Sequence, residues 1–438
     1  MMRTRLLWLV LVLLAAGPGL AQEKAAREVL PSGLSVIVQE TYSSPTVSLN
    51  VFVRVGSLHE TPENSGISHF YEHMFFRGTP TRSGLEFKRA IESLGGTTNA
   101  TTSRDFTHYY INLPSAYAEQ GLALLADALM NAECSTDSVE KEREVVLEEY
   151  RLGRSNPGRI LSDRLFTMAF KQHPYGRPII GTEENLKAIG RPQLLEFKRS
   201  YYTPDRTSLV IVGDVDRKRV LEKARELFGS FRGVGSPRDQ FTLEPPPTEP
   251  LVEDQSGPVS KAYVVLAFLG PSVKDQPDIY GMDVLTFLLG IGEGSVLTEL
   301  LVEPDIAEAT QVDFLTQAHP SLVMVTAVGD RKKVEEMRAG ILQGIEKIRQ
   351  GEFTDPELAR AKTILMTTYR FGNETNAGKA DSLGFYETID DWNFATGYLD
   401  RIGRVTRDDV VDVARRYLEK SYYGVIMTPE AAPPRREG

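Results

Sequence analysis

Two histidines and a glutamate lie within five residues of one another, in the order His69-x-x-Glu72-His73. The surrounding stretch from Gly66 to Phe76 is apolar nearly throughout and predicts a buried helix that begins near Ser65. Residues three and four positions apart share one helical face, so these three polar side chains form a single stripe. Burying such a stripe is costly unless something pairs with it, and a divalent metal would do so. The alternative is a helix whose histidines are satisfied by other groups in the core.

The spacing also indicates which chemistry a metal would support. Two histidines one helical turn apart can bind one zinc ion, while Glu72 between them can reach a metal-bound water without being a ligand. Glu72 is therefore the candidate general base of a hydrolysis. The other four histidines are expected to be structural, namely His59, His108, His173 and His319. Cys134 is the only cysteine, which excludes an intramolecular disulfide and favours a buried thiol.

A catalytic zinc site needs a third protein ligand and one open position. Residues 136–151 predict a helix in which Glu142 and Glu149 bracket an inward-facing valine pair, Val145 and Val146. Glu149 is the candidate third ligand. The alternative is a solvated helix, because this segment is rich in charge, and periodicity alone leaves that choice open.

The composition is that of a globular protein with a substantial core: 438 residues, 41% hydrophobic and 25% charged. Strands are expected over 29–38, 46–55 and 206–212, and a helix over 217–228, which together indicate an α+β fold. The formal charge of −10 argues against nucleic acid or an anionic membrane as the main partner.

Residues 1–21 have the pattern of a cleavable signal peptide. Arg3 and Arg5 precede an apolar run over 6–16, which a Gly-Pro pair interrupts, and small residues follow up to Ala21. The run is too short for a stable membrane anchor. We therefore predict cleavage after Ala21 and a periplasmic or secreted protein with no membrane anchor after cleavage.

Residues 233–250 are rich in glycine, serine, proline and charge, and predict a linker between two domains. It separates an N-terminal domain over 22–232, which carries the candidate metal site, from a C-terminal domain over 251–438, which lacks one. The second domain repeats the pattern of the first, with a strand over 262–269 followed by a helix from Tyr280. This indicates an internal duplication. Two unrelated α+β domains are the alternative.

The chain resembles the inverted-zincin metallopeptidases that include pitrilysin, insulin-degrading enzyme and the mitochondrial processing peptidase, and most closely their short bacterial members. The resemblance rests on the His-x-x-Glu-His motif and on Glu149, which follows His73 by 76 residues. Other similar stretches are 95–100, 173–175, 201–204 and 211–214, so the similarity covers nearly the whole mature chain. It implies two homologous α/β sandwich domains that form half of a peptidase chamber.

The resemblance also implies roles for individual residues. His69, His73 and Glu149 would hold one Zn²⁺ per chain, and Glu142 would orient a ligating histidine. The strand around Asn99 and Ala100 would bind an extended substrate peptide by strand addition. The local alternative for this region is a helix end at Gly95 followed by a turn, and both can hold at once.

One departure from the family pattern concerns the second half. Active members carry an arginine and, seven positions later, a tyrosine that contact the substrate and the reaction oxyanion. Leu301 and Glu308 stand in those places, and no arginine occurs anywhere over 239–330. We therefore expect a zinc-dependent endopeptidase subunit for unfolded peptides that pairs with a homologous subunit carrying the Arg/Tyr pair. The alternatives are a non-catalytic scaffold of the same fold and an exported binding module without metal.

Overall fold

The computed structural model describes residues 24–233 and 240–430, so the predicted signal peptide and part of the predicted linker lie outside the described residues. The first half contains strands β1 (Ala26–Val29), β2 (Ser35–Glu40), β3 (Thr46–Val53), β4 (Gly78–Thr79), β5 (Arg82–Ser83), β6 (Thr97–Thr102), β7 (Thr107–Pro114) and β8 (Thr207–Gly213). Its helices are α1 (Ile67–Phe75), α2 (Gly84–Ser93), α3 (Ala118–Asn131), α4 (Thr136–Gly153), α5 (Pro157–Ala169), α6 (Glu183–Ala188), α7 (Arg191–Tyr201) and α8 (Arg217–Phe228). The second half contains β9 (Leu251–Gly257), β10 (Ala262–Leu269), β11 (Ala309–Phe314), β12 (Leu322–Gly329) and β13 (Tyr423–Pro429). Its helices are α9 (Asp278–Gly290), α10 (Val334–Gln350), α11 (Asp355–Gly372), α12 (Asn376–Ile389), α13 (Asn393–Arg404) and α14 (Arg407–Tyr417).

The two large sheets share one topology. The first has the strand order β1-β2-β8-β3-β7-β6, and the second has the order β11-β12-β10-β13-β9. Read from the opposite end, the second sheet matches the first from β2 onward. In each sheet the first of these strands pairs in parallel with the last strand of its half, and the remaining pairs are antiparallel. The α+β fold with two similar sandwiches is confirmed, and the shared strand order is what an internal duplication produces.

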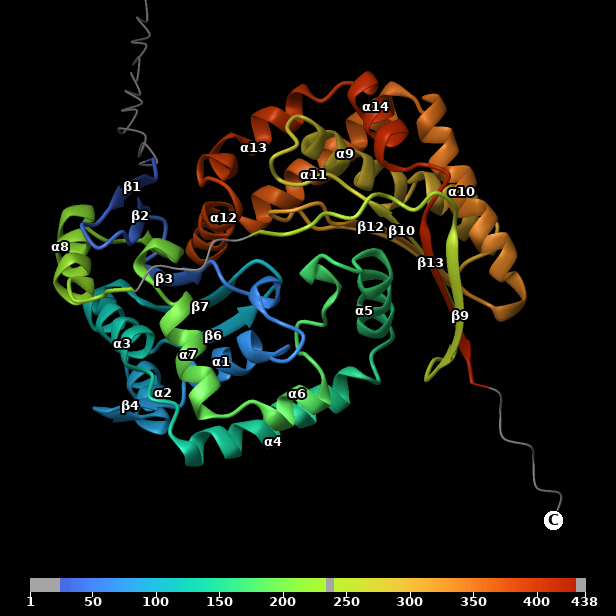
Figure 1. Cartoon of the computed structure of the whole chain (residues 1–438). Helices are drawn as coiled ribbons and strands as arrows, with labels where there is room; N and C mark the ends of the chain where they lie inside the picture. Colours follow the sequence, from blue (N-terminus) through green and yellow to red (C-terminus); the bar gives the residue numbers. More distant parts are fainter. Residues whose placement is uncertain (1–23, 234–239, 431–438) are drawn as a thin grey trace, which may run out of the picture.

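One helix of each half packs on the sheet of the other half: α5 on the second sheet and α12 on the first (Figure 1). Leu165 and Ala169 of α5 belong to one buried cluster with Val265 and Val425 of the second sheet. In exchange, Ala380 and Leu383 of α12 lie in one buried cluster with first-sheet residues, which are Ile37, Phe52, Val210 and Val212. Because apolar burial is the main favourable term in folding, this exchange binds the two halves into one body.

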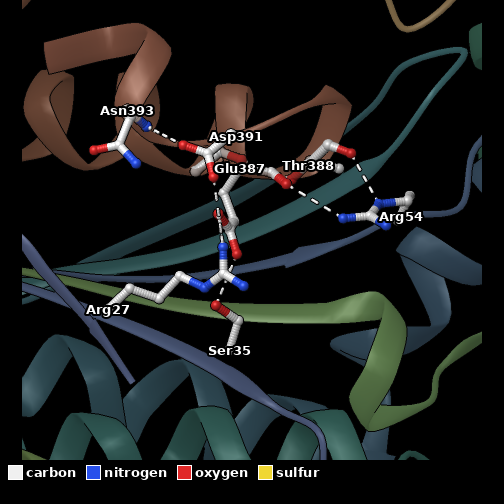
Figure 2. Close-up of polar contacts among 8 residues, drawn as sticks. Arg27, Ser35, Arg54, Glu387, Thr388, Asp391 and Asn393 are labelled. Atoms are coloured by element: carbon white, nitrogen blue, oxygen red, sulfur yellow. Dashed lines mark hydrogen bonds and ion pairs between the residues drawn. The ribbon is translucent and has the colours of Figure 1, made fainter. Parts of the chain in front are cut away.

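Polar contacts fasten the end of α12 to the first sheet (Figure 2). Glu387 is buried, and its Oε1 accepts a hydrogen bond of 2.8 Å from Ser35 while Oε2 lies 3.3 Å from Nη1 of Arg27. Arg54 donates to the backbone carbonyls of Thr388 and Glu387, at 2.9 and 3.3 Å. These contacts satisfy a carboxylate that would be costly to bury alone, and they connect the end of α12 to β1, β2 and the residue after β3.

The predicted strands and helices occur at or near their expected places, with small differences at their ends. The short strand runs expected over 29–38, separated by a Ser-Gly pair, form part of a hairpin in which Gly33 with φ +97° lies between β1 and β2. The helix expected from Tyr280 begins two residues earlier, at Asp278. Cys134 is buried, as its hydropathy indicates. Over residues 24–233 and 240–430, no helix is long and apolar enough to span a membrane.

The contact of α12 with the first sheet gives a stability prediction. A Cβ on Gly384 would lie 2.0 Å from the ring of Phe52, a fully buried residue whose ring stacks on His108. We expect Gly384→Ala to destabilise the protein by about 1–3 kcal/mol, because overpacking displaces that ring. Gly403 of α13 is the matched control, since nothing lies within 4 Å of its Cβ position. Gly403→Ala should be neutral or stabilising by up to about 1 kcal/mol in the same chemical denaturation experiment. Equal effects of the two substitutions would contradict the described packing.

Candidate metal centre

A buried carboxylate fixes the start of helix α1, which carries His69, Glu72 and His73. Glu60 accepts hydrogen bonds from the backbone N–H groups of Gly66 and Ser68, at 2.8 and 2.9 Å. Gly66 itself has φ +98°, and a Cβ there would lie 2.5 Å from the carbonyl oxygen of Ile180. Glycine is therefore required at this position, and Glu60 satisfies two of the free N–H groups of the helix terminus.

The structure brings together the three predicted ligand residues. Ligand atoms of His69, His73 and Glu149 all lie within 4.8 Å of one another. Oε2 of Glu149 is 3.6 Å from Nε2 of His69 and 3.5 Å from Nε2 of His73. Ligands about 2.1 Å from a tetrahedral zinc lie about 3.4 Å apart, so the distances from Glu149 to the two histidines are close to those of such a site.

Glu142 lies behind His73 and orients its ring. Oε1 of Glu142 is 2.7 Å from Nδ1 of His73, and the other carboxylate oxygen forms an ion pair with Arg77. Burial alone would raise the pKa of Glu142, but its contacts with His73 and Arg77 hold that pKa below the ordinary value. An ionised Glu142 can only accept a hydrogen bond, so it selects the His73 tautomer that carries its proton on Nδ1.

That tautomer leaves a lone pair on Nε2 of His73, directed toward an oxygen of Glu149. Two electron-rich atoms 3.5 Å apart repel each other unless a proton or a cation lies between them. The pKa of His73 reflects this repulsion. Burial lowers that pKa, but the contacts with Glu142 and Glu149 outweigh burial and raise it to about 9, so the ring favours a second proton when no cation is present. Burial lowers the pKa of His69 to about 4, so that neighbouring ring stays neutral. A neutral imidazole and a carboxylate are suitable ligands for a divalent metal, and this donor set fits zinc.

Glu72 occupies the same cleft but does not belong to the ligand set. Its Oε2 accepts a hydrogen bond of 2.6 Å from the hydroxyl of Thr102, at the end of β6. Burial raises the pKa of Glu72, and the Thr102 hydrogen bond opposes that rise only in part. A held carboxylate with a raised pKa is what general-base chemistry near neutral pH requires.

These residues line a cleft of about 650 Å³ whose walls come from α1, α4, α5 and β6. Strand β6 is one of the two edge strands of the first sheet, and Asn99 and Ala100 line the cleft from it. The side-chain oxygen of Asn99 accepts the backbone N–H of Ala100, at 2.9 Å. An exposed edge next to the cleft can pair with an extended chain. The turn before β6 also has the expected helix end, with Gly95 at φ +73°.

Several residues of the cleft escaped the sequence analysis. Thr102, Arg77, Arg159 and Asp163 all line it, but they are common polar residues outside any motif. The alternation of β6 could have indicated Thr102, whereas the α5 residues depend on a tertiary arrangement with no local signal. The predicted valine pair is half wrong, because Val146 is fully buried but Val145 is 48% exposed.

Leu301 and Glu308 have structural surroundings of their own. Leu301 is fully buried in a short π-helical segment, Thr298–Val302, and packs against Gly340 of α10. Glu308 is exposed and forms an ion pair with Lys261. Neither residue lines the metal cleft.

The fold and the cleft together define a class of protein: a two-sandwich chain with an inverted His-x-x-Glu-His helix and a glutamate from a distant helix beside it. Comparison with known families agrees. Residues 35–183 match the insulinase family, peptidase family M16, and residues 188–365 match the family described as the peptidase M16 inactive domain. The chain belongs to the M16 peptidase family.

Relatives of this family align over nearly the whole chain. An uncharacterized zinc protease, YmxG of Bacillus subtilis, is 28% identical over 92% of this chain and 98% of its own length. A probable mitochondrial-processing peptidase subunit beta of Arabidopsis thaliana is 28% identical over 89% of this chain and 75% of its own length. The crystal structure of a protease from Helicobacter pylori superposes with a TM-score of 0.88 at 26% identity, covering 93% of this chain and all of that one.

The geometry gives a prediction for metal binding. We expect Glu149→Ala to weaken Zn²⁺ binding by at least about a hundredfold, because it removes one of three protein ligands. Glu148→Ala is the matched control, since Glu148 is exposed on the same helix and pairs only with Arg151 among the contacts described. Competition with a chelating dye, after metal removal from the purified protein, measures both affinities. Unchanged affinity in Glu149→Ala would place the third ligand elsewhere, with Glu142 the first residue to test.

Proposed function

We propose that this protein is a zinc-dependent endopeptidase subunit that binds one Zn²⁺ per chain and hydrolyses unfolded peptides or short polypeptides. The observation that carries the proposal is that one cleft contains both a candidate ligand set and a separate carboxylate. Three side chains converge with ligand spacing, while Glu72 is held beside them by Thr102 and outside the ligand set. Kinship with proteins named as zinc proteases supports the choice of metal and of reaction.

In this mechanism His69, His73 and Glu149 would hold the zinc. When bound, the ion would lower the pKa of a water and polarise the scissile carbonyl. Glu72 would accept a proton from the attacking water and later donate it to the leaving amine. Thr102 keeps one oxygen of Glu72 occupied, so the other oxygen is the one that exchanges the proton. Glu142 and Arg77 keep the His73 ring in its binding orientation.

The edge of β6 supports a peptide substrate in extended form. Asn99 and Ala100 would offer backbone groups to a chain that adds to the sheet as a further strand, beside the metal ligands. This mode requires an unfolded segment, because a folded protein does not present a free strand. In this mode the Asn99 side chain would have to move when substrate binds, because its oxygen accepts the hydrogen bond of the Ala100 N–H that a substrate strand would need.

Full activity requires a partner in this proposal. An oxyanion needs a positive charge or hydrogen-bond donors where its charge develops, and Leu301 and Glu308 supply neither. We propose a heterodimer with a homologous subunit that carries the Arg/Tyr pair, in which each chain forms half of a chamber. The name of the Arabidopsis relative, a processing-peptidase subunit, supports an assembly of more than one chain. We also propose that the protein is exported to the periplasm or secreted, with its signal peptide cleaved after Ala21.

A non-catalytic scaffold subunit is the competing function, and the missing Arg/Tyr pair is what favours it. Its difficulty is Glu72, because a purely structural metal site gains nothing from a buried carboxylate outside the ligand set.

Glu72→Gln separates these two functions. We expect this variant to bind zinc like the parent but to lose peptide hydrolysis by about a hundredfold or more, because an amide cannot accept the proton of water. Zinc content and cleavage of a quenched fluorescent peptide are measured on the same preparation. Glu144→Gln, an exposed change on α4, is the control and should cleave like the parent. Equal rates in Glu72→Gln and the parent would rule out the proposed mechanism.

The partner proposal has its own test. Co-expression with a homologous exported subunit that carries the Arg/Tyr pair should raise the hydrolysis rate by about a hundredfold, which is the typical effect of one oxyanion donor. The pair should co-elute in size-exclusion chromatography. Robust hydrolysis by a pure monomer or homodimer of this chain, with no gain from any such relative, would overturn the requirement.

A further inference from the structure

The metal cleft contains three arginines, and their surroundings differ. Arg77 is paired with Glu142. Arg104 is buried, donates to the carbonyl of Tyr175 at 3.1 Å, and lies 3.4 Å above the ring centre of Phe166. Both guanidinium groups are therefore already used by the protein itself.

Arg159 differs from the other two. It lies in the first turn of α5, lines the same cleft, and is neither fully buried nor fully exposed. Within residues 24–233 and 240–430, no hydrogen bond or ion pair engages its guanidinium. Asp163 stands one turn further along α5 and also lines the cleft, yet the two side chains do not form an ion pair.

The position of Arg159 is set by Gly153 at the end of α4. A Cβ on Gly153 would lie 2.8 Å from Nη1 and 3.1 Å from Cδ of Arg159, so the arginine packs directly over the glycine. Gly153 follows the ligand Glu149 by one helical turn. Arg159 lines the same cleft as His69 and Glu149. A guanidinium that no described hydrogen bond or ion pair engages thus stands in the cleft of the candidate metal ligands.

The opposite face of α5 is anchored in the second half of the chain, through Leu165 and Phe166 against the second sheet. Arg159 is therefore mounted on a rigid element and not on a loop. A pre-positioned guanidinium without a protein partner is suited to bind a planar carboxylate through two parallel hydrogen bonds.

We infer that Arg159 is a specificity-determining residue, which binds a carboxylate of the peptide substrate near the reacting bond. This inference rests on the proposed function, because it assigns a contact to the same substrate. An acidic side chain and a free peptide C-terminus carry the same carboxylate chemistry. Peptides with an internal glutamate are the expected ligands, since the cleft is formed at an open sheet edge that lets a chain pass.

Direct binding tests the inference without relying on turnover. The protein is the zinc-loaded Glu72→Gln variant, and the ligands are fluorescent decapeptides with blocked ends that differ only in a central Glu, Gln or Lys. We expect the Glu peptide to bind at least about tenfold more tightly than the Gln peptide, as a charge-assisted hydrogen bond gives. Adding Arg159→Gln should abolish that difference, and Arg159→Glu should transfer the preference to the Lys peptide.

The control variant is Arg154→Gln, which removes an exposed arginine outside the cleft and should leave the preference unchanged. A fourth peptide, with a central Gln and a free C-terminus, identifies the source of the carboxylate. Arg159-dependent tightening of this peptide alone would assign the contact to the chain end. Binding of all peptides without regard to charge, or a preference that survives Arg159→Gln, would overturn the inference. Failure of every peptide to bind would instead contradict the proposed function.

Discussion

The contact between α1 and α4 is the constraint on which the metal centre depends. It places two imidazoles opposite two carboxylates in a cleft where isolated charges would be costly. Arg77 neutralises the inner carboxylate, Glu142, whereas the outer one, Glu149, faces two ring nitrogens. Without a proton on one ring, the ring lone pairs face an ionised carboxylate, and a divalent cation between the three groups would interact favourably with all of them. If the proposed zinc binds here, its affinity is coupled to the stability of this contact.

The packing of α5 on the second sheet and of α12 on the first makes the geometry of the cleft depend on both halves of the chain. Helix α5 belongs to the first half in sequence but is buried against the second sheet, and its free face forms a wall of the metal cleft. Helix α12 is buried against the first sheet in return. The second half thus contributes to the geometry of the candidate site in the first half.

The motif made part of this site predictable from sequence. His69, Glu72 and His73 are fixed by helical spacing, and the strand before them and the helix of Glu149 follow from hydrophobic patterns. Periodicity could not choose between Glu149 as a ligand and as a solvated residue; the choice depended on the resemblance to a family. Val145 shows the limit of the pattern, since a helix that borders a cleft has a narrower buried stripe than a core helix. Arg159 and Thr102 could not be predicted, because their roles arise where elements distant in sequence meet.

The three arginines of the cleft have different roles because their surroundings differ. A guanidinium paired with a buried carboxylate, as in Arg77, acts on the metal ligands through His73. One that lies over an aromatic ring and donates to a carbonyl, as in Arg104, serves the packing between α5 and the turn after β6. Only a guanidinium left without a protein partner retains its full binding capacity for a ligand. The absence of an arginine over residues 239–330 therefore does not leave the cleft without positive charge, because Arg77, Arg104 and Arg159 of the first half line it.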